Sequence, residues 1–148
     1  MIRFIGEYCV KVDDKGRIIL PAPFKALFGK EEKPVFVVKK DIYANCLQML
    51  TFQEWEKESE EVRQRLNLFN REHARFWREY MRGRALVEPD GKIGRISIPK
   101  SILSGIGVTK EVIFAGNNHM IEIWARENYE NEKMAQSDII ALTEKILG

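Results

Sequence analysis

The sequence contains two copies of one short pattern, Gly-Arg-Ile-x-aliphatic-Pro, and this repeat constrains the fold more than any other feature. Residues 14–21 read DKGRIILP, and residues 92–99 read KIGRISIP. The similarity extends in both directions, because residues 6–12 parallel residues 83–89 and each copy is followed by a short helix pattern and two β-rich runs. An ordered series of matching elements indicates that one supersecondary unit occurs twice in the chain.

The first half predicts two strands joined by a hairpin turn, followed by a short helix. Residues 8–12 and 17–20 are β-rich, and Gly16 in the intervening Asp-Asp-Lys-Gly segment supplies the positive φ that a tight turn needs. Pro21 ends the second run, and residues 23–28 place apolar side chains one helical turn apart. Two further β-like runs follow, at residues 35–38 and 46–50.

The second half repeats this order with weaker helix signals. Residues 101–107 form the helix pattern but contain two glycines, which lower helix propensity. The β-like runs are residues 112–115 and 120–124, and Asn117-Asn118 between them is typical of a turn. Each half therefore predicts strand, turn, strand, helix, strand, turn, strand.

Helices are predicted between the two halves and at the end of the chain. Residues 52–82 contain no Gly or Pro and carry apolar side chains at helical spacing, with a break expected near residues 67–70. A second helical pattern covers residues 127–147. We expect four parts: a first repeat (1–52), a helical connector (53–82), a second repeat (83–126) and a C-terminal helical tail (127–148).

Charge and hydropathy narrow the classes of protein to consider. The 148 residues include 24 basic and 22 acidic side chains, so the formal net charge is only +2 and any contact with nucleic acid must come from local clusters. The N-terminus lacks the long apolar stretch of a signal peptide, and no apolar run approaches the length that spans a membrane. We expect a soluble, cytoplasmic protein without a membrane partner.

Candidate catalytic and metal-binding patterns are weak. The two cysteines, Cys9 and Cys46, each lie in an apolar segment with no second Cys or His at ligand spacing, which favours buried, reduced thiols. His73 and His119 form no metal-binding motif either. Without a nucleophile, oxyanion or cofactor motif, the sequence predicts no enzyme, no cofactor and no metal.

Several segments together resemble the MraZ proteins. They are Gly6-Glu7-Tyr8, residues 13–17 with Pro21-Ala22, Glu54-Trp55-Glu56, Gly94-Arg95 with Pro99, and Ile121-Glu122-Ile123-Trp124. They occur in the family's order and cover nearly the whole chain. The resemblance implies an α+β fold of the AbrB-like group, with tandem pseudo-symmetric swapped-hairpin β-barrel units plus intervening and C-terminal helices, and a homo-oligomeric ring.

The resemblance also implies a function. MraZ proteins are bacterial transcriptional regulators that act at short direct repeats upstream of the division and cell-wall gene cluster, so double-stranded DNA is the expected partner and the nucleoid the expected location. The family's Asp-x-x-x-Arg signature maps onto Asp13 and Arg17. The second turn, from Asp90 to Arg95, is one residue longer, and a bulge there would restore the position of its acidic group.

The expected DNA-binding residues are Asp13, Lys15, Arg17, Asp90, Lys92 and Arg95. A guanidinium pairs bidentately with guanine, so the two arginines are candidates for base edges and the two lysines for phosphates. Asp13 is expected to orient Arg17 through a charge-assisted hydrogen bond. Arg3, Lys11 and Lys25 would add phosphate contacts if they share that face.

Other interpretations remain open, both for these residues and for the function of the protein. An Asp-x-Lys-Gly turn that ends in Arg is also an ordinary solvated hairpin, and the arginines between residues 63 and 84 alternate with glutamates as on a solvated or intersubunit helix face. The main alternative function is a ring-forming protein-interaction module without direct DNA binding. A hydrolase or transferase with an unrecognised site is the weakest.

Overall fold

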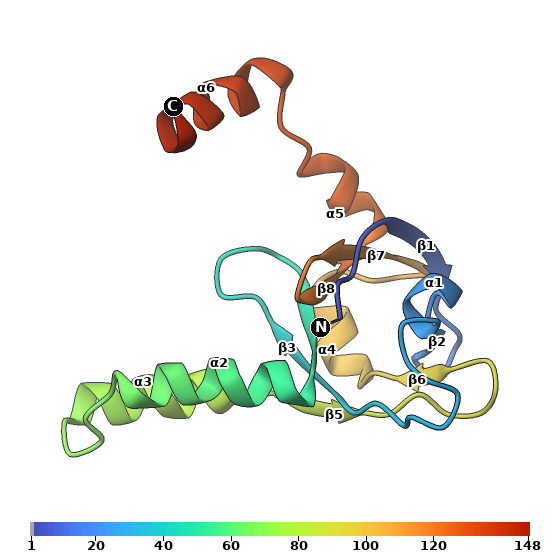
Figure 1. Ribbon diagram of the computed structural model, residues 1–148, viewed down its shortest axis with the longest axis horizontal. Coiled ribbons are helices and arrows are strands. Elements are labelled where there is room, and N and C mark those ends of the chain that lie inside the picture. The colour runs from blue at the N-terminus through green and yellow to red at the C-terminus, as the bar shows by residue number, and fades with distance from the viewer. Residues whose placement is uncertain (1) are drawn as a thin grey trace.

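The two halves of the chain fold together into one mixed α+β structure (Figure 1). The computed structural model describes residues 2–148, in which the strands form two antiparallel sheets, one of six strands in the order β1-β7-β8-β4-β3-β5 and one pairing β2 with β6. The strands are β1 (Glu7–Lys11), β2 (Arg17–Ile19), β3 (Phe36–Lys40), β4 (Leu47–Thr51), β5 (Ala85–Val87), β6 (Arg95–Ser97), β7 (Glu111–Asn117) and β8 (Met120–Ala125). The predicted α+β class is confirmed.

Most strand pairings join the first half to the second. Among the described residues 2–148, β3–β4 and β7–β8 are the only strand pairs within a half, whereas β1 pairs with β7, β4 with β8, β3 with β5, and β2 with β6. Each half thus contributes its first strand to the hairpin of the other half. Neither half completes its own sheet, so the repeat units depend on each other for folding. The swapped-hairpin β-barrel remains a prediction.

Of the hairpin expected between residues 8–12 and 17–20, the turn forms, but the two strands do not pair along their length. One bridge, Val12 to Ile18, links the two runs, and beyond it they separate to different partners. β1 forms a five-residue ladder with β7, and β2 lies against β6. The prediction of a hairpin was wrong because β propensity identifies strands, while the choice of partner follows from the apolar surface that each pairing buries.

The helices agree with the predicted order. They are α1 (Ala22–Lys25), α2 (Phe52–Gln64), α3 (Arg71–Met81), α4 (Lys100–Gly105), α5 (Arg126–Asn131) and α6 (Gln136–Leu147). The break between α2 and α3 falls where it was expected, and Thr51 and Asn70 cap the two helices by accepting backbone N–H groups. α2 and α3 project as a helical hairpin from the side of the molecule opposite β2 and β6 (Figure 1).

The main core lies between the sheets and the short helices. Its fully buried members come from both halves, as expected for interleaved strands: Phe4, Ile18, Leu20, Phe24, Phe36, Val38, Leu47, Met49, Ile96, Ile98, Ile106, Val112, Phe114, Ile121 and Ile123. In contrast, α6 buries no residue and stands apart from the sheets in Figure 1. Its apolar side chains are therefore exposed in a single chain.

A smaller cluster of buried side chains packs the helical hairpin of α2 and α3 against β3. Lys39 is buried, forms an ion pair with Glu58 of α2, and lies 5.5 Å from the centre of the Trp55 ring. The Tyr80 hydroxyl donates to the same carboxylate at 2.7 Å, and the Arg84 guanidinium lies 4.7 Å from the Tyr80 ring. Burial lowers the pKa of Lys39, although its carboxylate partner opposes this change.

The two cysteines occupy different environments. Cys46 is buried as expected, but Cys9 is exposed on β1, where its thiol donates to Glu111 at 3.3 Å. The prediction for Cys9 was wrong because β1 is an edge strand, and alternate side chains of an edge strand face solvent. No helix within residues 2–148 combines the length and the hydrophobicity that crossing a membrane requires.

Candidate nucleic-acid interface

The two Gly-Arg repeats meet in the two-stranded β2–β6 sheet. Arg17 lies opposite Ser97, and Ile19 lies opposite Arg95. Because side chains alternate along a strand, these four share one face, whereas Ile18 and Ile96 are buried on the other. Arg17 and Arg95 are therefore diagonal neighbours on the outer face, about 7–8 Å apart by sheet geometry.

The first turn is organised by the carboxylate of Asp13. Its Oδ1 accepts the backbone N–H groups of Lys15 at 2.9 Å and Arg17 at 2.8 Å, and its Oδ2 accepts Nε of Arg17 at 2.6 Å. These bonds, led by the one from the Arg17 backbone, lower the pKa of Asp13. Within residues 2–148 the two terminal nitrogens of Arg17 have no hydrogen-bond partner. The predicted orientation of Arg17 by Asp13 is confirmed.

The second turn closes by backbone bonds alone. Asp90 N–H donates to the Arg95 carbonyl at 2.7 Å, and Arg95 N–H donates back at 2.9 Å. The four-residue loop between them accommodates the extra residue through Gly91 and Gly94, both at φ +72°. Across the described residues 2–148, no hydrogen bond or ion pair joins the Asp90 and Arg95 side chains. The bulge expected to restore the acidic group does not give Arg95 the support that Arg17 has.

Each turn packs against the helix region of the other half, the first turn beside the start of α4 and the second beside the end of α1. Gly16 lies at φ +76°, and a Cβ there would sit 2.8 Å from the Ile98 carbonyl oxygen and 3.5 Å from Cγ of Lys100. At the second turn, a Cβ on Gly94 would sit 3.1 Å from Cδ of Lys25. Glycine is needed at both positions, and one lysine lies beside each turn.

A lysine-rich groove of about 920 Å³ adjoins the second turn. Its walls carry four lysines, Lys25, Lys30, Lys33 and Lys92, together with the acidic residues Glu32, Glu88 and Asp90. This arrangement of charged side chains could bind a nucleic-acid phosphate backbone that passes close to the lysines. Lys30, Lys33 and Lys100 were missed by sequence reasoning, because only their position relative to the turns distinguishes them from other surface lysines.

The structure brings together most, but not all, of the predicted site residues. Asp13 and Lys15 lie at one end of the antiparallel β2–β6 sheet, and Asp90 and Lys92 lie at the other. All four are exposed. Lys25 joins this surface, whereas Arg3 lines a separate hollow beside α2 with Lys57 and Glu61. Arg3 therefore lies outside the candidate interface.

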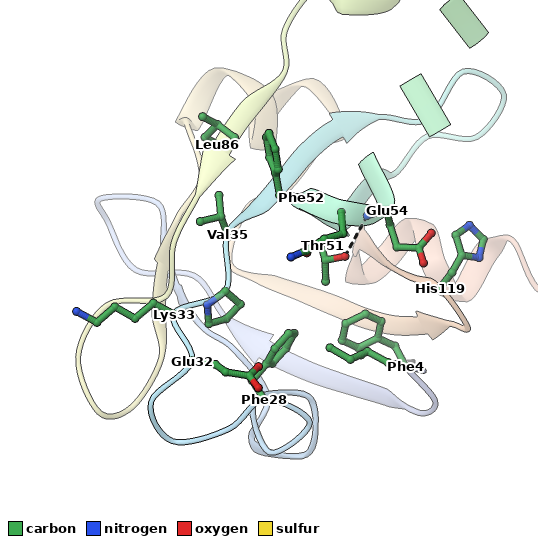
Figure 2. Close-up of a pocket in the computed structure, with 13 residues that line it drawn as sticks. Phe4, Phe28, Glu32, Lys33, Val35, Thr51, Phe52, Glu54, Leu86 and His119 are labelled. Atoms are coloured by element: carbon green, nitrogen blue, oxygen red, sulfur yellow. Dashed lines mark hydrogen bonds between the residues drawn. The ribbon is translucent and has the colours of Figure 1, made fainter. Parts of the chain in front are cut away.

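A second pocket, of about 840 Å³, is mainly apolar (Figure 2). Figure 2 shows the rings of Phe4 and Phe28 along one wall and Phe52 on another, with His119 and Glu54 at one side. Thr51 accepts the backbone N–H of Glu54 at 3.3 Å, so this contact is a helix cap rather than a catalytic pair. The pocket offers apolar contact area, and its polar groups do not form a nucleophile–base arrangement.

Comparisons with known proteins agree on one family. The family model described as "MraZ protein, putative antitoxin-like" matches residues 3–79 and 81–145, once in each half. Two proteins called "Transcriptional regulator MraZ" are similar over nearly their whole length: that of Bacteroides fragilis is 35% identical over 147 residues, covering 99% of this chain and 92% of the relative. That of Clostridium tetani is 34% identical over 143 residues, covering 97% and 96%.

Proposed function

The chain belongs to the MraZ family, and on this premise we propose that it is a transcriptional regulator that binds double-stranded DNA sequence-specifically through the outer face of the β2–β6 sheet. Its relatives are named as regulators and not as enzymes. Two exposed strands with arginines on one face have the form of a β-ribbon, which can enter or straddle a DNA groove.

The observation that carries the proposal is the geometry of Arg17. Asp13 holds Nε and the backbone N–H of Arg17, while the two terminal nitrogens remain available. These nitrogens match the O6 and N7 acceptors of guanine in the major groove, a pairing that discriminates by about 1–3 kcal/mol. A guanidinium already fixed by its neighbour loses less conformational entropy on binding. Arg17 is the proposed base-reading residue.

The other residues of the surface have supporting roles. Lys15 and Lys92 on the turns, with Lys25 and Lys100 beside them, would neutralise phosphates and fix the position of the sheet on DNA. Arg95 would contact a second base, but it lacks a carboxylate partner and is less constrained. Asp13 acts through Arg17, and Asp90 serves the second turn through its backbone.

We also propose that the protein is a homo-oligomer, and that the subunits form a ring. One face of α6 carries five apolar side chains that are exposed in the single chain as the structure describes it (residues 2–148): Ile139, Ile140, Leu142, Ile146 and Leu147. Such a face is normally covered in solution by another polypeptide. A ring presents identical turns at regular intervals, so weak contacts would add along a repeated site.

The family further supports short direct repeats upstream of the division and cell-wall gene cluster as the target, and the nucleoid as the location. Repeats of a site, rather than palindromes, suit subunits related by ring rotation. The proposal includes four functional parts of the chain: a first repeat (1–52), a helical connector (53–82), a second repeat (83–126) and a C-terminal tail (127–148).

The competing proposal is a ring-forming interaction module without direct DNA binding, and the apolar pocket of Figure 2 favours it. A salt titration separates the two. Fluorescence anisotropy would compare a duplex from upstream of the protein's own coding sequence with a shuffled duplex. The DNA-binding proposal predicts tighter binding of the first and a linear fall of log affinity with log salt. Equal or undetectable binding of both duplexes at low salt would favour the interaction module.

A further inference from the structure

Three potential metal ligands converge where the β3–β4 turn meets β8. Asp41 follows β3, Cys46 precedes β4, and Glu122 lies on β8 opposite Gln48. One ligand atom from each, two carboxylate oxygens and the Cys46 sulfur, all lie within 4.8 Å of one another. This cluster is separate from the β2–β6 surface, and the proposed function does not use it.

Cys46 is a buried polar group without a partner. Its side chain is 0% exposed, and no hydrogen bond to Sγ occurs within residues 2–148. Burial first, and then the nearby charges of Glu122 and Asp41, raise the pKa of this thiol from 9.0 to about 12. A buried group in such surroundings is normally satisfied by something. A cation between the sulfur and the carboxylates would satisfy all three.

The carboxylates are already held by other donors. Asp41 Oδ1 accepts the backbone N–H groups of Tyr43 and Ala44, each at 2.8 Å, and Oδ2 accepts Nε2 of Gln48 at 2.6 Å. Glu122 Oε1 accepts Nε1 of Trp124 at 3.2 Å, which leaves Oε2 without a described partner. Hydrogen bonds of this kind orient metal ligands and contribute to metal affinity. The cluster therefore has outer support as well as ligands.

We propose that Asp41, Cys46 and Glu122 bind a thiophilic divalent cation, with Zn²⁺ the best fit, and that a water molecule completes the coordination. One thiolate with two carboxylate oxygens suits zinc, whereas magnesium and calcium favour oxygen ligands alone. Tetrahedral bonds of about 2.0–2.3 Å place ligand atoms roughly 3.5 Å apart. The side chains would close by about an ångström, and the thiol proton would pass to solvent on binding.

Binding would add a further link between the two halves of the chain, which are already joined by the β4–β8 pairing. Asp41 and Cys46 belong to the hairpin of the first half, and Glu122 belongs to the hairpin of the second half. A bound cation would therefore stabilise the central β4–β8 pairing against unfolding. Local spacing cannot reveal the site, because Glu122 is distant from Cys46 in the sequence and no His or second Cys accompanies it.

Co²⁺ titration of the full, reduced, metal-free protein tests this directly, because a thiolate ligand gives an intense near-ultraviolet charge-transfer band. The wild type should develop the band to an endpoint of one Co²⁺ per chain, and Zn²⁺ should abolish it. Cys46→Ser should remove the band. Cys9→Ser, the matched control at the exposed thiol, should keep it.

Glu122→Gln serves as a second variant, because Glu122 is only partly buried and the change is isosteric. It should lower Co²⁺ affinity by at least about tenfold, and zinc should no longer raise its unfolding temperature as it does for the wild type. The proposal is overturned if the wild type gives no charge-transfer band with excess Co²⁺. It is equally overturned if the band follows Cys9, or if Glu122→Gln binds Co²⁺ as tightly as the wild type. DNA binding is measured in a separate experiment. The outcome of the Co²⁺ titration therefore neither supports nor contradicts the proposed DNA-binding function.

Discussion

The Asp13 carboxylate lies 2.6 Å from Nε of Arg17 and also accepts the backbone N–H of the same residue. One side chain thus fixes both the turn and the direction of the guanidinium. At the second turn, the only hydrogen bonds between the corresponding pair, Asp90 and Arg95, in residues 2–148 are the two between their backbones. The two copies of one motif therefore differ in the feature that would matter most for reading a base.

The first prediction follows from this difference. Asp13→Asn should reduce the ratio of specific to non-specific DNA affinity by roughly tenfold, because an uncharged amide accepts a weaker hydrogen bond from Arg17 than the carboxylate does and orients the guanidinium less firmly. Affinity for shuffled DNA should not fall, since a negative charge is removed near phosphates. Anisotropy titrations with both duplexes measure the ratio.

Asp90→Asn is the matched control, because within residues 2–148 no hydrogen bond or ion pair joins the side chains of Asp90 and Arg95. It should leave the specificity ratio within about twofold of the wild type, a change below roughly 0.4 kcal/mol. Equal losses in the two variants would show that the Asp13–Arg17 pair has no special role.

The second prediction concerns the close packing of the first turn. Gly16→Ala combines a φ of +76° with a Cβ only 2.8 Å from the Ile98 carbonyl oxygen. It should lower the free energy of unfolding by about 2–3 kcal/mol. Gly91→Ala has a similar φ of +72° but no atom within 4 Å, so it should cost only about 1 kcal/mol. Urea unfolding of both variants measures these two losses. A greater loss of unfolding free energy in Gly91→Ala than in Gly16→Ala would contradict the prediction.

The third prediction concerns the anchor of the helical hairpin. Glu58→Ala leaves the buried Lys39 ammonium without an anion and should lower the free energy of unfolding by about 2 kcal/mol. This is less than for a fully buried pair, because 34% of the Glu58 side chain is exposed. Tyr80→Phe removes one hydrogen bond to the same carboxylate and should cost about 1 kcal/mol.

Adding Lys39→Met to Glu58→Ala removes the stranded charge and should recover part of the lost stability in urea unfolding. If the double variant is less stable than Glu58→Ala alone, the unpaired ammonium is not the source of the loss.

The fourth prediction is a pH dependence of stability in metal-free protein. Burial, followed by the nearby charges of Glu122 and Asp41, raises the pKa of the Cys46 thiol from its ordinary value of 9.0 to about 12 in the folded protein. Between these values the unfolded chain binds fewer protons, so stability falls as pH rises, by up to about 1.4 kcal/mol per pH unit. Cys46→Ala should lack this contribution. The difference in unfolding free energy between wild type and variant, measured from pH 8 to about 11, should shrink with pH rather than stay constant.

Sequence patterns predicted the positions of the helices and strands better than they predicted which strands pair with each other. The duplicated motif, the short helices after each proline and the break before α3 all follow from local residue types, which act over a few positions. The pairing of β2 with β6 does not, because three-residue strands carry little register information. The pairing instead buries Ile18 opposite Ile96, a contact between residues far apart in the sequence.

In the candidate site, too, contacts between residues close in sequence could be predicted, whereas contacts that depend on strand pairing could not. Asp13 and Arg17 are close in sequence, so their contact followed from the motif, and the extra residue before Arg95 indicated that the second turn would differ. Lys25 and Lys100 reach the turn of the opposite half only because the halves exchange strands. The Asp41, Cys46 and Glu122 cluster likewise depends on the β4–β8 pairing.

The most direct measurement of the central claim is the affinity of Arg17→Ala/Arg95→Ala for the upstream duplex and for a shuffled one. Loss of the base-reading groups should bring the two affinities to within a few-fold of each other, while Lys15→Ala, a phosphate contact, should weaken both about equally. Circular dichroism establishes that each variant is folded. If the double variant still prefers the upstream duplex as strongly as the wild type does, the β2–β6 surface does not read DNA sequence in this protein.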